Sequence, residues 1–284
     1  MVRRHPSITV LLLWLAPLCF LLLFYFYPMA SILKLSLERS QAGLLAPFIE
    51  AVQSPITWQV ITFTFWEAFL STLLTLAIGL PGAYLVSHYN FKGKGLLQAL
   101  TGIPFLMPTL VVAAAFNALL GPGGWINLGL IKAFGLSGPP IQFNNTLIAI
   151  LVAHVFYNTT IVLRMVGDFW SHIDPRLSSA ARMLGANRWQ AVRRVTLPLL
   201  TPSIFFTGIL ALIGAFQVFD QVYVMANPGK PGEATITLVY FIYENGFRNF
   251  KMGYAAAASW ILFLIVATLT LVYFRLQRRW VHYQ

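Results

Sequence analysis

The chain has 284 residues, of which 58% are hydrophobic and only 10% are charged, and its formal net charge is +11. Soluble domains carry about 25% charged residues, so lipid must be the solvent for part of this chain. The positive charge does not indicate nucleic-acid binding, because Lys and Arg occur in short clusters between apolar runs, as membrane-topology signals do. Cys19, the only cysteine, lies inside the first apolar run and can form neither an internal disulfide nor a cysteine-based zinc site. The composition predicts one all-α transmembrane domain over residues 1–284.

A helix needs about 20 mostly apolar residues to span a bilayer, and six segments meet this requirement. The first follows Arg3 and Arg4 and is longer than the core of a cleavable signal peptide, so we expect it to be retained as a membrane helix. The predicted spans are residues 9–33, 57–87, 96–120, 146–166, 202–225 and 254–274.

The basic residues predict the orientation. An even number of crossings places both termini on the same side of the membrane, together with most of the 19 Lys and Arg residues. Positive charge favours the cytoplasm, so both termini are expected to be cytoplasmic. The basic residues on that side are Arg3, Arg4, Lys92, Lys94, Arg164, Arg176, Arg182, Arg188, Arg193, Arg194, Arg275, Arg278 and Arg279.

Residues 168–200 form a long cytoplasmic connection that does not have the composition of a loop. Asp174 is a good helix N-cap, and Pro175 suits a first helical turn. Gly185 is expected to interrupt the helix, and a second short helix should end at 196–198, before the fifth span. Such an amphipathic segment either docks into a groove of a soluble partner or lies on anionic lipid through its arginines. The residue pattern alone leaves both alternatives open.

The spacing of residues 179–181, Gly185 and 195–198 resembles the E-A-A-x3-G-x9-I-x-L-P signature of binding-protein-dependent ABC importer permeases. The family's Glu falls on Ser179 and its Ile on Val195. The resemblance implies a type I, MetI-like fold in which this segment is a coupling helix that contacts the ATPase. The residues implied in that contact are Ser179, Ala180, Ala181, Leu184, Gly185, Ala186, Leu197 and Pro198.

Two parts of the chain resemble different subfamilies of these permeases. Residues 47–202 are most similar to iron(III)- and thiamine-type permeases, for example in the Gly-Pro-Gly-Gly-Trp run at 121–125. Residues 216–284 look more like sugar-type permeases, for example in the run at 216–225. The resemblance therefore implies import of either an iron(III)- or thiamine-like small solute or a sugar.

The resemblance also implies partners and a location. The chain has no G-x-x-x-x-G-K-[ST] sequence, so it is not expected to bind ATP or to act as an enzyme. The energy would come from a homodimer or heterodimer of separate ABC ATPase subunits. A second permease subunit, an extracytoplasmic solute-binding protein and membrane lipid complete the expected partners, in a bacterial inner membrane. No cofactor or metal is expected in this chain.

Polar side chains inside the spans mark a candidate translocation path, because burying them in lipid costs free energy. Glu67 and Asp220 should face the bundle interior or lie near the outer interface. The alternative role is helix-to-helix hydrogen bonding that holds the bundle together. His154 has no partner at the spacing of a metal site. The candidates are Glu67, Asn117, His154, Asn158, Gln217, Asp220 and Gln221.

An ion-driven secondary transporter and an intramembrane enzyme are the alternative classes of protein. An ion-driven secondary transporter would require broken helices and an internal repeat, and it would leave the segment 168–200 unexplained. An intramembrane enzyme would require paired carboxylates, a His cluster or a nucleophile with its base. The eight acidic residues are scattered along the chain, which makes this the weakest of the three hypotheses.

Overall fold

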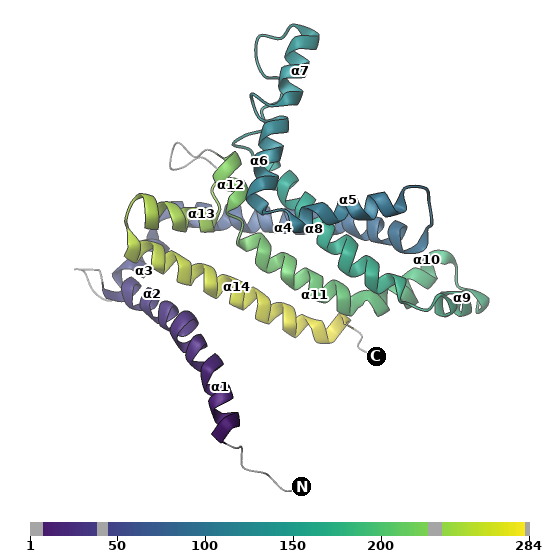
Figure 1. Ribbon diagram of the computed structural model, residues 1–284, viewed down its shortest axis with the longest axis horizontal. Coiled ribbons are helices and arrows are strands. Elements are labelled where there is room, and N and C mark those ends of the chain that lie inside the picture. Colours follow the sequence, from purple (N-terminus) through teal and green to yellow (C-terminus); the bar gives the residue numbers. More distant parts are fainter. Residues whose placement is uncertain (1–7, 39–44, 227–234, 282–284) are drawn as a thin grey trace. The chain divides into compact units, whose positions relative to one another are not determined.

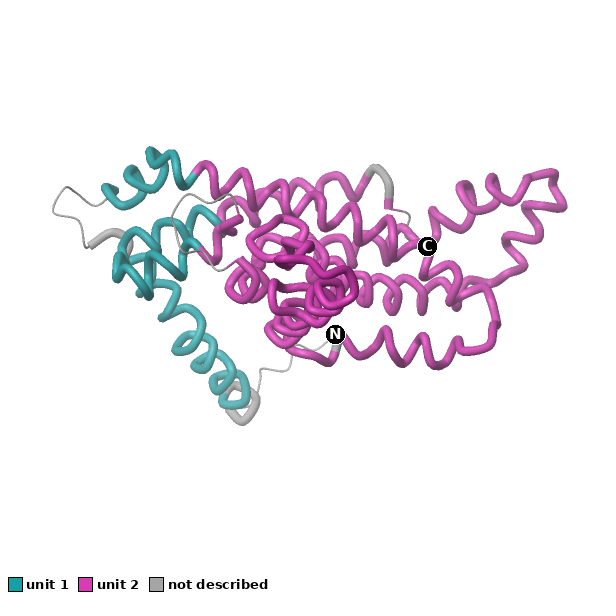
Figure 2. The backbone as a smooth tube through the Cα atoms, turned by 90° about the horizontal axis from the view of Figure 1, so that it is seen from above, with its two compact units in different colours: residues 1–57, 241–262 teal, residues 58–240, 263–284 magenta. Residues whose placement is uncertain are grey.

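The computed structural model describes residues 8–38, 45–226 and 235–281, and every regular element in these ranges is helical. Parts of two predicted outer connections, residues 39–44 and 227–234, lie outside the described residues. The chain divides into two compact units, which Figure 2 shows in different colours. Unit 1 comprises residues 1–57 and 241–262, and unit 2 comprises residues 58–240 and 263–284.

Six helical stretches are long and apolar enough to cross a membrane, as the sequence predicts. Their lengths range from 23 to 34 residues. They are Leu12–Lys34, Pro55–His88, Thr109–Phe134, Leu147–Ser171, Arg188–Phe216 and Met252–Arg278.

Unit 1 contains the first span and short helices that follow it. The span consists of α1 (Ile8–Leu21), a π-helical turn (Leu22–Phe26) and α2 (Tyr27–Glu38), and the large apolar side chains between residues 12 and 33 are exposed, as lipid contact requires. Within this unit, Thr57 and Tyr254 share a 2.8 Å hydrogen bond between their hydroxyl groups. The other elements that lie wholly or partly in unit 1 are α3 (Ala46–Gln53), α4 (Pro55–His88), α13 (Leu238–Tyr243), a π-helical turn (Glu244–Arg248) and α14 (Met252–Trp280).

In unit 2, small residues bring α4 and α8 (Leu147–Ser171) close together. A Cβ atom added at Gly79 would lie 2.7 Å from Cγ1 of Val162, and one added at Gly82 would lie 2.6 Å from Cδ2 of Leu163. Helices in membranes associate through such small residues because lipid provides no hydrophobic driving force between them. Helix α8 also packs against α5 (Lys94–Leu106) and α11 (Leu197–Phe216), as Figure 1 shows.

The predicted third span, residues 96–120, is wrong as a single helix. Helix α5 ends at Leu106, and α6 (Thr109–Leu120) begins after Met107, whose ψ of 138° is extended. Pro108 explains the break, because proline disfavours helical geometry in the residue before it. The connection expected at 121–145 begins too early, because α7 (Trp125–Phe134) belongs to the third spanning stretch, Thr109–Phe134.

The expected end of the second cytoplasmic helix at residues 196–198 is wrong as well. Helix α10 (Arg188–Ala191) continues through a π-helical turn (Val192–Thr196) into α11. The helix can continue past residues 196–198 because of the π-helical turn. In this turn the Leu197 N–H bonds to Val192 O, five residues back. The wider turn accommodates Pro198, which has no N–H. The predicted fifth span then ends early, because Gln217 interrupts it before α12 (Asp220–Met225).

Candidate functional site

The segment from Asp174 to Thr196, here named the coupling segment, begins at a well-defined helix cap. The Asp174 side chain accepts a 2.8 Å hydrogen bond from the Arg176 N–H, and Pro175 occupies the first turn of α9 (Pro175–Met183). Both features follow the prediction. A side-chain cap satisfies one of the four backbone donors that have no partner in a helix, so the start of α9 needs no support from neighbouring elements.

The end of α9 forms a sharp corner. Gly185 has a φ of +92°, and its N–H bonds to Arg182 O at 3.0 Å, while Ala186 N–H bonds to Ala181 O at 3.1 Å. This pair of hydrogen bonds is a Schellman motif, which needs a left-handed residue at the position of Gly185. No atom lies within 4 Å of a Cβ added at Gly185. Glycine is therefore favoured here by the positive φ and not by a lack of space for a side chain.

A capping box starts the next helix directly after this corner. The Asn187 side chain accepts a bond from the Gln190 N–H, and the Gln190 side chain accepts one from the Asn187 N–H, both at 2.8 Å. Only Ala186 separates the two caps. Because every one of these hydrogen bonds is local, the corner is preorganised, and the interruption expected at Gly185 has this geometry.

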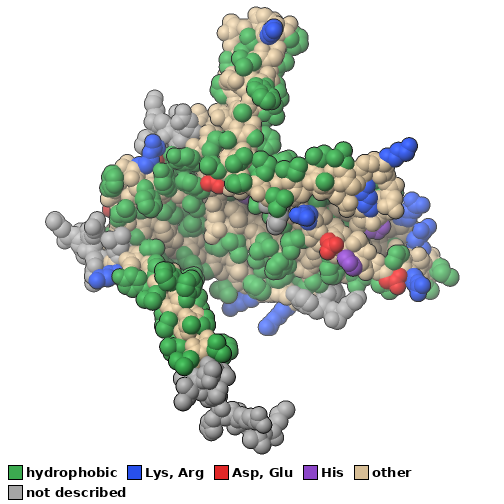
Figure 3. Space-filling model, viewed as in Figure 1, with side chains coloured by type: hydrophobic (Ala, Val, Ile, Leu, Met, Phe, Trp, Pro, Cys, Tyr) green, Lys and Arg blue, Asp and Glu red, His purple; other side chains and the backbone are tan. Residues whose placement is uncertain are grey.

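The corner presents apolar side chains to the outside. Met183 and Leu184 are each 90% exposed and Trp189 is 69% exposed, and α9 contains no buried residue. Lys and Arg side chains gather at the end of unit 2 that carries α9 and α10 (Figure 3). Exposed apolar residues with a polar rim are typical of a protein interaction surface. Sequence reasoning missed Met183 and Trp189, although both are large apolar residues beside the motif.

Aromatic residues of α4 and α8 share a cavity with the coupling segment. The ring centroids of Tyr84 and Trp170 lie 5.3 Å apart, and those of His88 and Trp170 lie 5.4 Å apart. These side chains and α9 line a cavity of about 520 Å³. The coupling segment and the ends of two spanning helices therefore face the same cavity.

The structure brings together six of the eight residues expected to contact the ATPase. Ser179, Ala180, Ala181, Leu184, Gly185 and Ala186 lie in α9 and its corner, whereas Leu197 and Pro198 begin α11. The hydroxyl of Ser179, at the motif's Glu position, donates to Pro175 O at 3.1 Å within its own helix.

Among the candidate path residues, Glu67 and His154 form a buried pair. Glu67 Oε1 lies 2.8 Å from His154 Nδ1, and the two residues are 0% and 3% exposed. This contact connects α4 and α8 in the interior, where Glu67 was expected. Glu67 Oε2 and the hydroxyl groups of Ser71 and Thr75 are buried without a hydrogen-bond partner, so a polar strip continues along α4.

The remaining path candidates are separated from this pair. Asp220 accepts a hydrogen bond from the Thr109 hydroxyl, and Asn117 accepts one from Asn144 at 2.8 Å. Asn158 and Gln221 are buried, while Gln217 is exposed. The described part of the chain contains no group of three or more His, Cys, Asp or Glu residues that could hold a metal ion.

We expect the Glu67–His154 pair to stabilise the bundle. Glu67→Ala and His154→Ala should each destabilise it, and the double variant should be more stable than the sum of the two losses implies. Coupling energies of about 0.5–2 kcal/mol are typical of polar contacts between membrane helices. Thermal unfolding of the four proteins in one detergent measures this energy. Strictly additive losses would show that the contact contributes nothing to stability.

Comparisons with known proteins identify the class to which this fold and segment belong. Residues 75–282 match the family model described as binding-protein-dependent transport system inner membrane component, and the chain belongs to this family. It is 28% identical to the lactose transport system permease protein LacF of Rhizobium radiobacter in an alignment of 281 residues that covers 92% of each chain. It is 30% identical to the spermidine/putrescine transport system permease protein PotB of Haemophilus influenzae over 225 residues, covering 78% of this chain and 76% of PotB.

A solved structure shows the same fold. The chain resembles a chain of a bacterial alginate ABC transporter in complex with an alginate pentasaccharide-bound periplasmic protein, with a TM-score of 0.81, 21% identity and coverage of 95% and 94% of the two chains. The protein is thus the permease subunit of an ABC importer and a multi-pass protein of a bacterial inner membrane. These relatives give no specific support to the iron(III) or thiamine substrate suggested by residues 47–202.

Proposed function

We propose that this permease imports a carbohydrate and receives the force for transport through its coupling segment from a separate ATPase. The observation that carries the proposal is the corner at Gly185, with two 90%-exposed apolar side chains held by local caps. A partner with a hydrophobic cleft could bury both side chains without any rearrangement of the corner. Preorganisation of this kind reduces the entropy lost on binding.

The interfacial-lipid alternative is less consistent with the shape of the segment. A helix that lies on a membrane places its apolar residues along one face of its length. Here the most exposed apolar side chains, Met183 and Leu184, are at the very end of α9, where the chain turns. Apolar residues concentrated at a corner favour insertion into a cleft.

The corner is followed by a continuous helix that could carry force into the membrane. The stretch Arg188–Phe216 has 29 helical residues, which corresponds to roughly 44 Å at 1.5 Å per residue. An ATPase that moved the corner would therefore move α11 through this continuous helix. A second permease subunit and an extracytoplasmic solute-binding protein would complete this importer.

The carbohydrate assignment is supported by the relatives and by the charges in the spans. The similarity to the lactose permease covers nearly the whole of both chains, and the structural relative belongs to an alginate importer. A polyamine would require carboxylates to replace its hydration. Of the acids proposed for the path, Glu67 is bonded to His154 and Asp220 to Thr109. Parallel uptake assays with a radiolabelled disaccharide and with radiolabelled spermidine test the carbohydrate assignment. Uptake of spermidine without uptake of the disaccharide would refute it.

The ATPase contact is tested by the double substitution Met183→Ser and Leu184→Ser. Burying a Met or Leu side chain contributes about 1.5–3 kcal/mol, so loss of both should weaken binding of the ATPase by roughly 100-fold or more. Co-purification and titration of the detergent-solubilised permease with its ATPase measure the effect. Insertion into the membrane should be unchanged.

A matched control is Leu136→Ser, which alters an exposed apolar residue in the connection that follows α7. This variant should bind the ATPase as the unmodified chain does. If Met183→Ser with Leu184→Ser binds equally well, the corner does not dock into the ATPase.

A further inference from the structure

Two cavities of unit 2 adjoin each other between α4, α5 and α8. One is polar, with a volume of about 570 Å³, and the other is almost wholly apolar, with a volume of about 640 Å³. Thr101 and Leu163 line both of them. The two cavities therefore form one amphipathic groove with a polar end and an apolar end.

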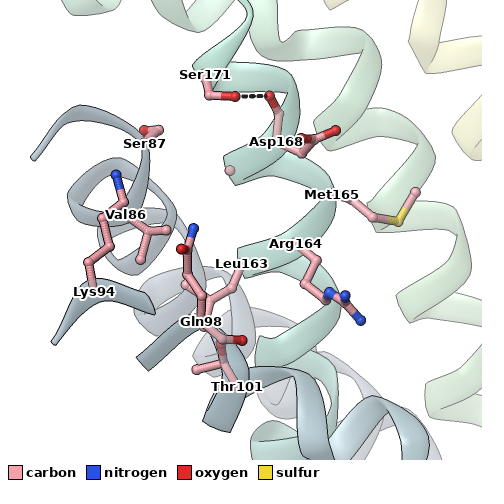
Figure 4. A pocket seen from close by; sticks show the side chains of 11 residues that line it. Val86, Ser87, Lys94, Gln98, Thr101, Leu163, Arg164, Met165, Asp168 and Ser171 are labelled. Atoms are coloured by element: carbon pink, nitrogen blue, oxygen red, sulfur yellow. Dashed lines mark hydrogen bonds between the residues drawn. The ribbon is translucent and has the colours of Figure 1, made fainter. Parts of the chain in front are cut away.

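The polar cavity lies where three helices end. Its lining comes from the last turns of α4 and α8 and from the first turns of α5, as Figure 4 shows. Helices α4 and α8 both belong to membrane spans, so this end of the groove lies at a membrane surface. The lining side chains are therefore at the depth of lipid head groups.

The charges in this cavity favour an anion. Lys94 of α5 and Arg164 of α8 line this cavity together with one carboxylate, that of Asp168. A Cβ atom added at Gly102 of α5 would lie 3.9 Å from Nη1 of Arg164. The guanidinium group therefore lies beside a position of α5 that has no side chain. Lys94 Nζ donates to Asn90 Oδ1 at 3.2 Å, which uses one of its three donors. Further hydrogen-bonding side chains around these charges are those of Ser87, Gln98, Thr101 and Ser171.

The apolar cavity continues along the spans. Leu74 and Ile78 of α4 lie in the middle of that helix, and Val155 and Phe156 occupy the corresponding part of α8. The only polar side chains in its lining are those of three threonines, Thr101, Thr159 and Thr160. A soluble anion would leave this half of the groove unfilled.

We propose that the groove binds one anionic glycerophospholipid, with its head group in the polar cavity lined by Lys94 and Arg164 and an acyl chain along the apolar cavity. Basic pockets between membrane helices are known to select anionic head groups, and the continuous apolar section supplies the place for the tail. The two cations exceed the single carboxylate, so an anionic head group is preferred over a zwitterionic one. This inference does not depend on the docking role of the coupling segment.

The test is retention of lipid by the full chain, purified from membranes and analysed by native mass spectrometry against added phosphatidylglycerol. A basic residue near a membrane surface changes the binding of anionic lipid by about fivefold. We therefore expect Lys94→Gln and Arg164→Gln each to reduce retention of phosphatidylglycerol about fivefold, and the double variant about 30-fold. Lys132→Gln, an exposed lysine of α7, is the matched control and should have no effect.

A second variant tests the apolar half without changing any charge. Leu151→Trp, on the wall of the apolar cavity, should displace the lipid while Lys94 and Arg164 remain. Unchanged retention in both charge variants would overturn the proposal. Equal retention of phosphatidylethanolamine would overturn the preference for an anionic head group, and displacement by inorganic phosphate alone would show a site for a soluble anion.

Discussion

Replacing Gly185 with valine should reduce uptake at least about tenfold while the chain still inserts into the membrane. Gly185 has a φ of +92°, which a β-branched residue adopts only at a cost of about 1–3 kcal/mol. The substitution would be relieved by unwinding the Schellman motif that holds Met183 and Leu184 in place. Because 1.4 kcal/mol corresponds to a factor of ten, loss of the corner geometry should be visible in both uptake and ATPase binding.

Gly129→Val provides a matched control for this substitution. Gly129 lies in α7, no atom lies within 4 Å of its added Cβ, and its φ is not positive. The same increase in side-chain size therefore meets no backbone strain there, and assembly with the ATPase should be retained. Normal uptake by Gly185→Val would contradict the docking role and would leave the motif with a purely local role in folding.

Gly79→Leu should destabilise the bundle itself. A Cβ at this position would lie 2.7 Å from Cγ1 and 2.8 Å from Cβ of Val162, and Val162 is 1% exposed in a close-packed cluster. The Cβ atom of Val162 is fixed by its backbone, so α4 and α8 must move apart. Overpacking of this kind costs about 1–3 kcal/mol, which corresponds to a fall of roughly 2–12 °C in the thermal unfolding midpoint.

The control for Gly79→Leu is Gly214→Leu in α11, where the added Cβ has no neighbour within 4 Å and the residue is exposed. Thermal unfolding in the same detergent should leave this variant close to the unmodified chain. An equal loss of stability at both positions would show that leucine is harmful for reasons other than the contact between α4 and α8.

The number and approximate location of the spans could be predicted because length and hydropathy alone determine whether a helix can cross a bilayer. The positions at which these helices break could not be predicted in the same way, since they depend on individual backbone hydrogen bonds. Pro108 breaks a helix, whereas Pro198 does not, because a π-helical turn precedes it. The same arrangement occurs at Pro28, which follows the π-helical turn Leu22–Phe26.

The candidate site was predictable where its determinants are local. The cap at Asp174 and the corner at Gly185 depend on residues within a few positions of each other, and the spacing indicated both. The contact between Glu67 and His154 joins residues 87 positions apart, and no periodic pattern indicates it. Asn127 was also missed, although it is fully buried and its side-chain amide donates hydrogen bonds to the carbonyl groups of Gly121 and Ile141.

The exposed apolar side chains of the corner should also affect how long the permease persists in the cell before it binds its ATPase. A newly inserted permease without an ATPase would present Met183 and Leu184 to the surrounding solution, and chaperones and quality-control proteases recognise such surfaces. We therefore expect orphan copies to be short-lived, so that the cellular abundance of this subunit follows the supply of its ATPase.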